Sequence, residues 1–158
     1  MGPLQRVVGA VGVNETGTPR VFHPGDIPAR PHHPLARSAR IVTPESTGSQ
    51  RLFAGMFWND PGASGGWSFR GDDPDEGQMV DGIPHLGAHD EKYLCLSGRV
   101  RVTWDEGEFE FGANDVVYFA AGRTYLTEVV GDDPVQVFYV IAPAPGWMVP
   151  LGAAAEAT

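Results

Sequence analysis

The chain has 158 residues, of which 42% are hydrophobic, so it is long enough for one domain with a substantial core. Its 21 glycines and 14 prolines are spread so evenly that a packed helical domain is excluded and an all-β fold is favoured. A net charge of −9 disfavours nucleic-acid binding, because an acidic surface repels phosphate backbones.

Three features of the sequence bear on where the protein works. No apolar run approaches the length of a membrane span, so no membrane partner is expected. The first residues, MGPLQRVVGAVGV, lack the charged region, apolar run and cleavage site of a signal peptide. The single cysteine, Cys95, cannot form an internal disulfide, which suits a reducing compartment. We therefore expect a cytoplasmic protein.

The first 38 residues are predicted to form an arm or hairpin that packs on the main domain. Two β-prone runs, 6–13 and 20–23, are joined by the turn sequence NETGTP. The Pro-rich stretch that follows, 24–34, does not suit the interior of a sheet. Its adjacent histidines, His32 and His33, are expected to be exposed loop residues rather than ligands.

The main domain is predicted to span 39–146. Its first strands are expected at 39–43 and 52–58, with the turn sequence PESTGSQ between them, and a further strand begins at the sequence GWSF. The insert RGDDPDEGQMVD, 70–81, holds five carboxylates without the regular spacing of a calcium loop. We interpret it as a solvated loop at the mouth of the domain, which would act as a lid if it moves.

The remaining strands follow at short intervals. They are expected at 92–96, 100–104, 109–111, 116–119, 125–130 and 135–143. Turn sequences that contain Gly, Asn or Asp separate them, because these residues tolerate the backbone conformations that tight turns need. Short runs broken in this way are typical of a meander that closes into a sandwich or barrel. Residues 147–158 are predicted to be a frayed tail.

Two spacings in this region resemble the motifs of the cupin family. The sequence EKYLCLSG places six residues between Glu91 and Gly98, as in the Glu-x6-Gly half of the first cupin motif. After fifteen further residues, NDVVYFAAGRTY matches the second motif in shape, with Asn114 and Ala120 in place of its usual Gly and Pro. The resemblance runs from about residue 51 to residue 143. It implies an all-β cupin double-stranded β-helix, which is an antiparallel jelly-roll barrel.

The same resemblance implies a metal-ligand set that is incomplete in this chain. Cupins take their ligands from two His in a His-x-His sequence, a Glu further along that strand, and a His of the second motif. His85 matches the first His and Glu91 matches the Glu, whereas Gly87 and Tyr125 stand at the other two His positions. Cupins that resemble ectoine synthase and the ethanolamine-utilisation proteins also lack part of this set, and HDEKYLCLSG is similar to their sequences.

Strand alternation predicts which side chains face one another across the barrel. On an extended chain His85, His89 and Glu91 lie on one side, which the resemblance makes the inward side, and Tyr125 faces them. A barrel of this size holds one small ligand. The residues expected to bind that ligand are Trp58, Trp67, Tyr93, Tyr118 and Thr127.

Three interpretations of this pocket remain open. In the first, His85, His89 and Glu91 hold a divalent metal ion such as Zn, Fe, Mn or Ni. In the second, there is no metal, and Glu91 is a desolvated general acid or base partnered by Tyr125 or His85. In the third, the domain is a binding module or structural barrel whose polar residues are satisfied.

We favour an enzyme that performs proton transfer on a small oxygen-bearing substrate, such as isomerisation, cyclisation, dehydration or lyase action. Its catalytic residues would be Glu91, Tyr125 and His85: Glu91 moves the proton and Tyr125 donates a hydrogen bond to a developing oxyanion. The alternatives are a metal-dependent cupin oxygenase and a non-catalytic cupin that binds a small ligand. We expect a bacterial homodimer, with a place in secondary metabolism.

Overall fold

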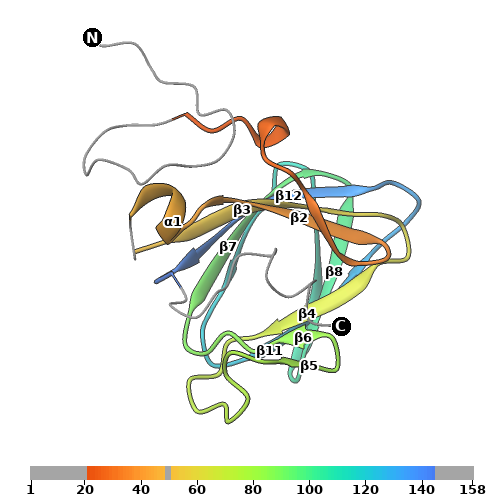
Figure 1. The fold of residues 1–158 in the computed structure, drawn as a ribbon. Helices are drawn as coiled ribbons and strands as arrows, with labels where there is room; N and C mark the ends of the chain where they lie inside the picture. The colour runs from red at the N-terminus through yellow and green to blue at the C-terminus, as the bar shows by residue number, and fades with distance from the viewer. Residues whose placement is uncertain (1–20, 49–50, 145–158) are drawn as a thin grey trace.

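The computed structural model describes residues 21–48 and 51–144, without the side chains of His32 and His33. Most of these residues lie in β-strands that form two antiparallel sheets, and the sheets enclose a common interior (Figure 1). The predicted all-β jelly-roll architecture is confirmed. The predicted strand at 6–13 and the predicted tail at 147–158 lie outside the described residues.

The two sheets differ in size. The strands of the six-stranded sheet, in spatial order, are β1 (Arg30–His33), β2 (Ala36–Val42), β3 (Phe53–Asn59), β12 (Val135–Ala142), β7 (Asp90–Ser97) and β10 (Val116–Phe119). The strands of the four-stranded sheet are β4 (Ser64–Ser68), β11 (Thr124–Val129), β8 (Arg99–Trp104) and β9 (Gly107–Gly112). A small hairpin, β5 (Met79–Val80) and β6 (Ile83–Pro84), and two short helices, η1 (Pro24–Asp26) and α1 (Pro44–Thr47), complete the described elements.

Strand alternation builds the main core between the sheets. In β7 the side chains of Glu91, Tyr93 and Cys95 are buried and those between them are exposed. The long strand β12 alternates in the same way over its eight residues. Aromatic rings fill much of the interior, and the rings of Tyr93 and Phe119 meet edge to face with their centroids 4.7 Å apart. The interior face of β7 is therefore the one on which Glu91 lies.

Strand β3 is buried on both of its faces. Phe53 and Phe57 join the main core, whereas Met56 belongs to a second, smaller core on the outer side of the sheet. Phe22 and Ile27, from the segment before β1, pack against this outer core. The predicted arm thus includes residues that cover the six-stranded sheet. Its predicted end at residue 38 falls inside β2, because β1 and the start of β2 already belong to the sheet.

Two predictions for the connecting segments are wrong in detail. The turn predicted at 44–50 contains the one-turn helix α1, which Thr43 and Ser46 close with reciprocal hydrogen bonds of 2.8 and 3.0 Å. His32 and His33 lie in β1 rather than in a loop. Strand β1 is nevertheless at the edge of its sheet, where Pro31 interrupts no interior ladder.

Two turns of the resemblance region require a positive backbone φ. Gly98, between β7 and β8, has a φ of 76°, and a side chain there would lie 2.6 Å from the Pro134 carbonyl oxygen. Asn114 has a φ of 74°, which asparagine tolerates better than most other residues do. Asn114 therefore occupies a backbone conformation that also suits the glycine of the usual motif.

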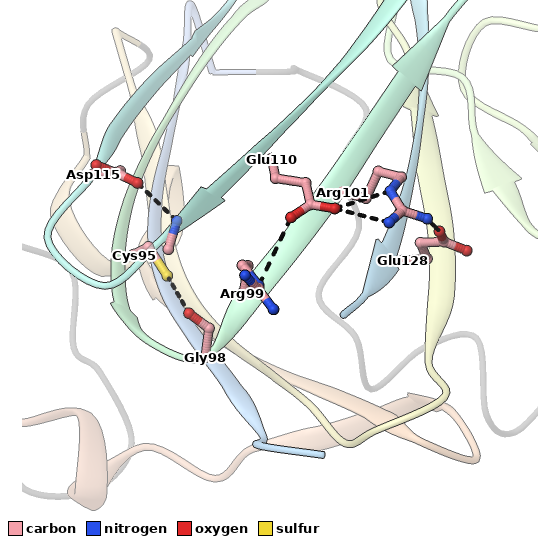
Figure 2. A network of polar contacts seen from close by, with 8 residues as sticks. Cys95, Gly98, Arg99, Arg101, Glu110, Asp115 and Glu128 are labelled. Carbon is pink, nitrogen blue, oxygen red and sulfur yellow. Dashed lines mark hydrogen bonds and ion pairs between the residues drawn. The ribbon is translucent and has the colours of Figure 1, made fainter. Parts of the chain in front are cut away.

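The outer face of the four-stranded sheet carries a row of ion pairs (Figure 2). Arg101 of β8 lies between Glu110 of β9 and Glu128 of β11, with a nitrogen–oxygen distance of 2.8 Å to each carboxylate. These charges are partly exposed, so each pair contributes little stability. Cys95 of β7, labelled in the same view, is fully buried, and its thiol donates to the Ser97 carbonyl. None of the helices in the described ranges has the length and apolar character that crossing a bilayer demands.

Candidate functional site

A cavity of about 290 Å³ opens between the two sheets. Its size is at the lower end of the range for small-molecule sites. One wall comes from the six-stranded sheet, the opposite wall from β4 and β11, and the rim from the segment that contains β5 and β6. The lining residues are Ala36, Ser38, Arg40, Phe57, Asn59, Ser64, Gly65, Gly66, Trp67, Met79, Gly82, Pro84, Leu86, Glu91, Thr127, Tyr139 and Ile141.

Glu91 is the acidic group on the cavity wall. Its residue is only 2% exposed, and its Oε2 atom has no hydrogen-bond partner among the described residues. Burial raises the pKa of this carboxyl well above its usual value, because water no longer stabilises the charged form. The Tyr93 hydroxyl nearby opposes this shift, although it makes no hydrogen bond of good geometry. The raised pKa favours the protonated form of this carboxyl, which can donate a proton.

Tyr139 and Arg40 also line the cavity, and neither was predicted as a site residue. Tyr139 of β12 is paired with Tyr93 on one side and with Gly55 of β3 on the other. Gly55 is in turn paired with Arg40 of β2. A Cβ atom at Gly55 would lie 2.6 Å from the Tyr139 hydroxyl oxygen, so only glycine leaves room for that hydroxyl. The missing side chain lets Tyr139 extend across β3 towards Arg40.

Burial and neighbouring charges shift the pKa values of both Tyr139 and Arg40. Burial raises the pKa of Tyr139, against the opposing effect of the neighbouring Arg40. Burial lowers the pKa of the Arg40 guanidinium, while Tyr139 and Glu45 act to raise it. The guanidinium also lies over the Phe53 ring, 5.6 Å from its centroid. Tyr139 therefore keeps its proton and can donate it in a hydrogen bond, as arginine can with its guanidinium.

The five residues predicted to bind substrate fall into two groups. Trp67 and Thr127 line the cavity, and Tyr93 lies behind it in contact with the Trp67 ring. Trp58 and Tyr118 lie elsewhere. Trp58 packs against the outer core of the six-stranded sheet under Arg37, and Tyr118 is 56% exposed on the outer face of β10.

Tyr125 faces the interior but does not line the cavity. Its ring packs between Phe69, Trp104 and Phe119 in the main core. Its hydroxyl donates a hydrogen bond to the Ala120 carbonyl at 3.1 Å. In the described structure this hydroxyl thus has a structural partner, and Tyr139 is the tyrosine that borders the cavity near Glu91.

His85 belongs to a polar network beside the cavity rather than to its wall. The neighbouring residues Pro84 and Leu86 line the cavity, and the imidazole of His85 points to Asp73, with 2.6 Å between Nδ1 and Oδ2. Hydrogen bonds from the Asp75 backbone and from His85 lower the pKa of Asp73, whose side chain is 5% exposed. An ionised Asp73 only accepts, so Nδ1 of His85 carries a proton in this contact.

The insert that was predicted to be a solvated loop supplies this network. Ser68 of β4 donates to Asp73 at 3.0 Å, and Thr124 of β11 donates to Ser68 at 3.1 Å. Because Ser68 contacts the aspartate and not the imidazole, the group does not form the nucleophile–base contact of a hydrolase triad. One oxygen or nitrogen atom of each of Asp73, Asp75 and His85 lies within 4.8 Å of the others.

The structure does not bring His85, His89 and Glu91 together. Among the described residues, a cluster with metal-ligand spacing is found at Asp73, Asp75 and His85 instead. The prediction extended strand alternation too far, since β7 begins only at Asp90 and Gly87 has a φ of 77°. His89 instead donates from Nδ1 to the carbonyl oxygen of Pro143, 2.7 Å away.

No protein-family model matches the sequence, and no curated protein sequence matches it. Solved structures do match. A predicted oxalate decarboxylase from Thermotoga maritima aligns with a TM-score of 0.60 at 16% identity, over 78% of this chain and 98% of that one. An RmlC-like cupin from Shewanella frigidimarina aligns with a TM-score of 0.58 at 13% identity, over 80% and 93%. The chain has the cupin fold.

A third structure, KdgF from Halomonas sp., covers 77% of this chain and 93% of its own, with a TM-score of 0.57 at 13% identity. At identities this low, the similarity shows a shared fold and does not show a shared function. In this chain the acidic segment 70–81 lies near Gly87, the position at which the cupin motif has its second histidine. A side chain at Gly87 would lie 2.6 Å from a carboxylate oxygen of Glu76, so the insert already fills the space beside that position.

Proposed function

We propose that this cupin is a small-molecule enzyme whose cavity performs proton transfer with Glu91 as the acid and base. The observation that carries the proposal is the buried carboxyl of Glu91, which faces a cavity and has an Oε2 atom without a partner. A buried carboxyl group is unfavourable unless it is paired or used. A raised pKa also brings a carboxyl group closer to the range that suits general acid–base catalysis near neutral pH.

In this mechanism the protonated Glu91 gives its proton to a carbonyl or hydroxyl oxygen of the substrate. The carboxylate that remains then takes up a proton from a substrate carbon or oxygen, which restores the acid. Tyr139 and Thr127 border the same cavity and would donate hydrogen bonds to the substrate oxygen, which would hold it in position for Glu91. Isomerisation, cyclisation, dehydration and lyase action all combine these two proton transfers.

The protonation of Glu91 gives a test that requires no known substrate. Carbon NMR of the side-chain carboxyl, assigned by comparison with Glu91→Gln, follows its titration directly. We expect the signal to stay that of a carboxylic acid well above pH 4.5, the usual pKa of glutamate. A titration at the usual value would contradict the proposal, because the group would then be a carboxylate at neutral pH with no proton to donate.

A metal ion is a second component that the donor set supports. Asp73, Asp75 and His85 offer two carboxylates and one imidazole, a combination that suits Zn, Fe, Mn or Ni. None of the three lines the cavity, so we propose that a bound ion would fasten the insert 70–81 against the barrel. This favours a structural metal over a metal-dependent oxygenase site.

Metal analysis of single variants separates this site from the one predicted by the cupin motif. In protein purified without chelators or an affinity tag, we expect His85→Ala to lose stoichiometric metal and His89→Ala to keep it. The reason is that His85 lies among the carboxylates, whereas His89 bonds the Pro143 carbonyl. Loss of metal in both variants would instead support the motif-based ligand set.

Two further expectations stay predictions. A non-catalytic cupin that binds a small ligand is the alternative from another functional class, and it would bind a ligand in the same cavity without turnover. The homodimer stays a prediction as well, and sedimentation analysis of the full chain tests it.

A further inference from the structure

A second hollow lies beside the cavity, on the outer side of the four-stranded sheet. We call it the outer cleft, and its volume is about 560 Å³. One of its sides is the outer face of the sheet, with Arg101 and Thr103 of β8 and Leu126 and Glu128 of β11. Its other side is formed by residues 81–83 of the β5–β6 hairpin. The hairpin therefore borders both the cavity and the outer cleft.

The cavity and the outer cleft meet at four residues that line both spaces, which are Ser64 and Gly65 of β4, Gly82 of the hairpin and Thr127 of β11. Strand β4 is at the edge of its sheet, and β6 packs beside it (Figure 1). Gly65 and Gly82 are exposed, whereas Thr127 is buried. We call the gap between Gly65 and Gly82 the mouth of the cavity.

The hairpin turns one side towards each space. Met79 and Pro84 are register partners and line the cavity, whereas Ile83, from the next pair, lines the outer cleft. Asp81 and Gly82 join the two strands with φ values of 51° and 77°. Positive φ at both central residues is what the tightest hairpin turns require. The tip of the hairpin is therefore a thin wall between the two spaces.

Each side of the mouth has a glycine. A Cβ atom at Gly65 or at Gly82 would meet nothing within 4 Å, so open space adjoins both residues. Gly65 is paired with the buried Thr127, so a side chain at this position would point inward and enter the mouth. Met79, at the rim of the cavity on the hairpin side, is 64% exposed.

The base of the hairpin is fixed to the barrel. The His85 amide donates to the Gln78 carbonyl at 2.9 Å, and the Gly77 amide donates to the His85 carbonyl at 2.8 Å. The Leu86 amide donates to the Ser68 carbonyl at 2.8 Å, which ties the end of the hairpin to β4. Backbone hydrogen bonds therefore hold the hairpin beside β4, and the side chains near its tip determine how wide the mouth is.

We propose that ligands reach the cavity from the outer cleft through this mouth, and that Gly65, Gly82 and Met79 determine the width of the ligands that enter. Two glycines admit the body of a ligand, and the flexible side chain of a methionine adapts to its shape. The inference rests on the proposed function only in taking the cavity as the functional site.

Access is measured with a cysteine placed deep in the cavity. Ile141 and Leu86 line the cavity but not the outer cleft, and they are 2% and 1% exposed. Ile141→Cys and Leu86→Cys are each treated with iodoacetamide and with the wider N-benzyliodoacetamide, and modification is followed by mass spectrometry of the peptides. Either reporter is sufficient if the other substitution destabilises the core. The buried Cys95 does not line the cavity, so its modification would reveal unfolding.

The rate with N-benzyliodoacetamide divided by the rate with iodoacetamide reports the width of the mouth, because the two reagents share one reactive group. We expect both reagents to modify the deep cysteines when the mouth is unchanged. Gly65→Val and Gly82→Asn should each lower the rate ratio about tenfold or more, which is the scale of the steric cost of one overpacked side chain. Thr103→Trp, in the outer cleft alone, should lower the ratio too, and Met79→Ala should raise it.

Gly25→Val and Gly131→Asn are the matched controls. Neither glycine lines the cavity or the outer cleft, and a Cβ atom at either would meet nothing within 4 Å. Gly131 has a φ of 84°, close to that of Gly82, and asparagine tolerates such values. Both controls should leave the rate ratio unchanged.

The proposal is overturned if the deep cysteines of the folded protein react with neither reagent, or if Gly65→Val and Gly82→Asn keep the ratio of the unchanged mouth. An unchanged ratio in Thr103→Trp would overturn entry from the outer cleft. These outcomes are distinct from failure of the proposed function, because no turnover is measured. Size-selective access to a cavity in which Glu91 titrates at its usual pKa would leave the mouth standing and remove the catalytic acid.

Discussion

Replacing Glu91 with glutamine is expected to lower turnover by roughly two to four orders of magnitude while leaving ligand affinity nearly unchanged. The amide keeps the shape of the carboxyl group and most of its hydrogen bonding, but it cannot exchange a proton. Glu91 is buried on the cavity wall, so this substitution changes one group that a bound ligand would contact and does not change the protein surface. A catalytic acid and a merely binding acid therefore respond differently.

The measurement determines turnover, ligand affinity and metal content for wild type, Glu91→Gln and Glu108→Gln. Glu108 is an exposed glutamate on β9 and serves as the matched control, with all three quantities expected to stay the same. Loss of metal in Glu91→Gln would show that Glu91 is a metal ligand. If all three quantities stayed at their wild-type values in Glu91→Gln, Glu91 would have a structural role. Its assignment as the catalytic acid and base would then be wrong.

The sequence predicts the position of Glu91 because the relevant signal is local. Inside β7 every second residue turns inward, so alternation together with the Glu-x6-Gly spacing is enough to place Glu91 on the interior face. The same logic points to Tyr139, which shares the inward face of β12 with Val137 and Ile141.

Other parts of the site depend on contacts between distant segments. Arg40 borders the cavity because β2 pairs with β3 opposite Gly55, and no local pattern gives that register. Asp73 meets His85 because the insert folds back onto β4 and β6, which a run of acidic residues does not reveal. For His85 and His89, alternation failed because the chain turns at Gly87 before the strand begins.

The second large effect is on stability, and it depends on pH. We expect the stability of Glu91→Gln, relative to wild type, to rise steadily as pH increases above 4.5. The unfolded chain exposes the carboxyl, which then has its usual pKa of 4.5, whereas burial raises the pKa in the folded chain well above this value. Between the two values the folded state keeps a proton that the unfolded state has lost.

The sign of the pH dependence of the unfolding free energy follows from this difference in bound protons. The contribution of the raised pKa is fully present below pH 4.5 and is lost as pH rises towards the folded pKa, because unfolding then releases a proton. The free energy of unfolding of wild type falls by about 1.4 kcal/mol per pH unit in this window from Glu91 alone. Glutamine has no such titration, and its buried amide costs about 1–3 kcal/mol at every pH if it lacks partners.

Urea unfolding of wild type and Glu91→Gln at a series of pH values from 4 to 8 measures the effect. All other titrating groups are shared, so their contributions cancel in the difference between the two proteins. The variant should be the less stable protein at low pH, and its stability relative to wild type should rise with pH up to the folded pKa of Glu91. Glu108→Gln should show no such trend, because both states expose its carboxylate to water. A difference that does not change with pH would mean that the buried carboxyl ionises as it does in water. Glu91 would then lack the proton that the proposed mechanism requires.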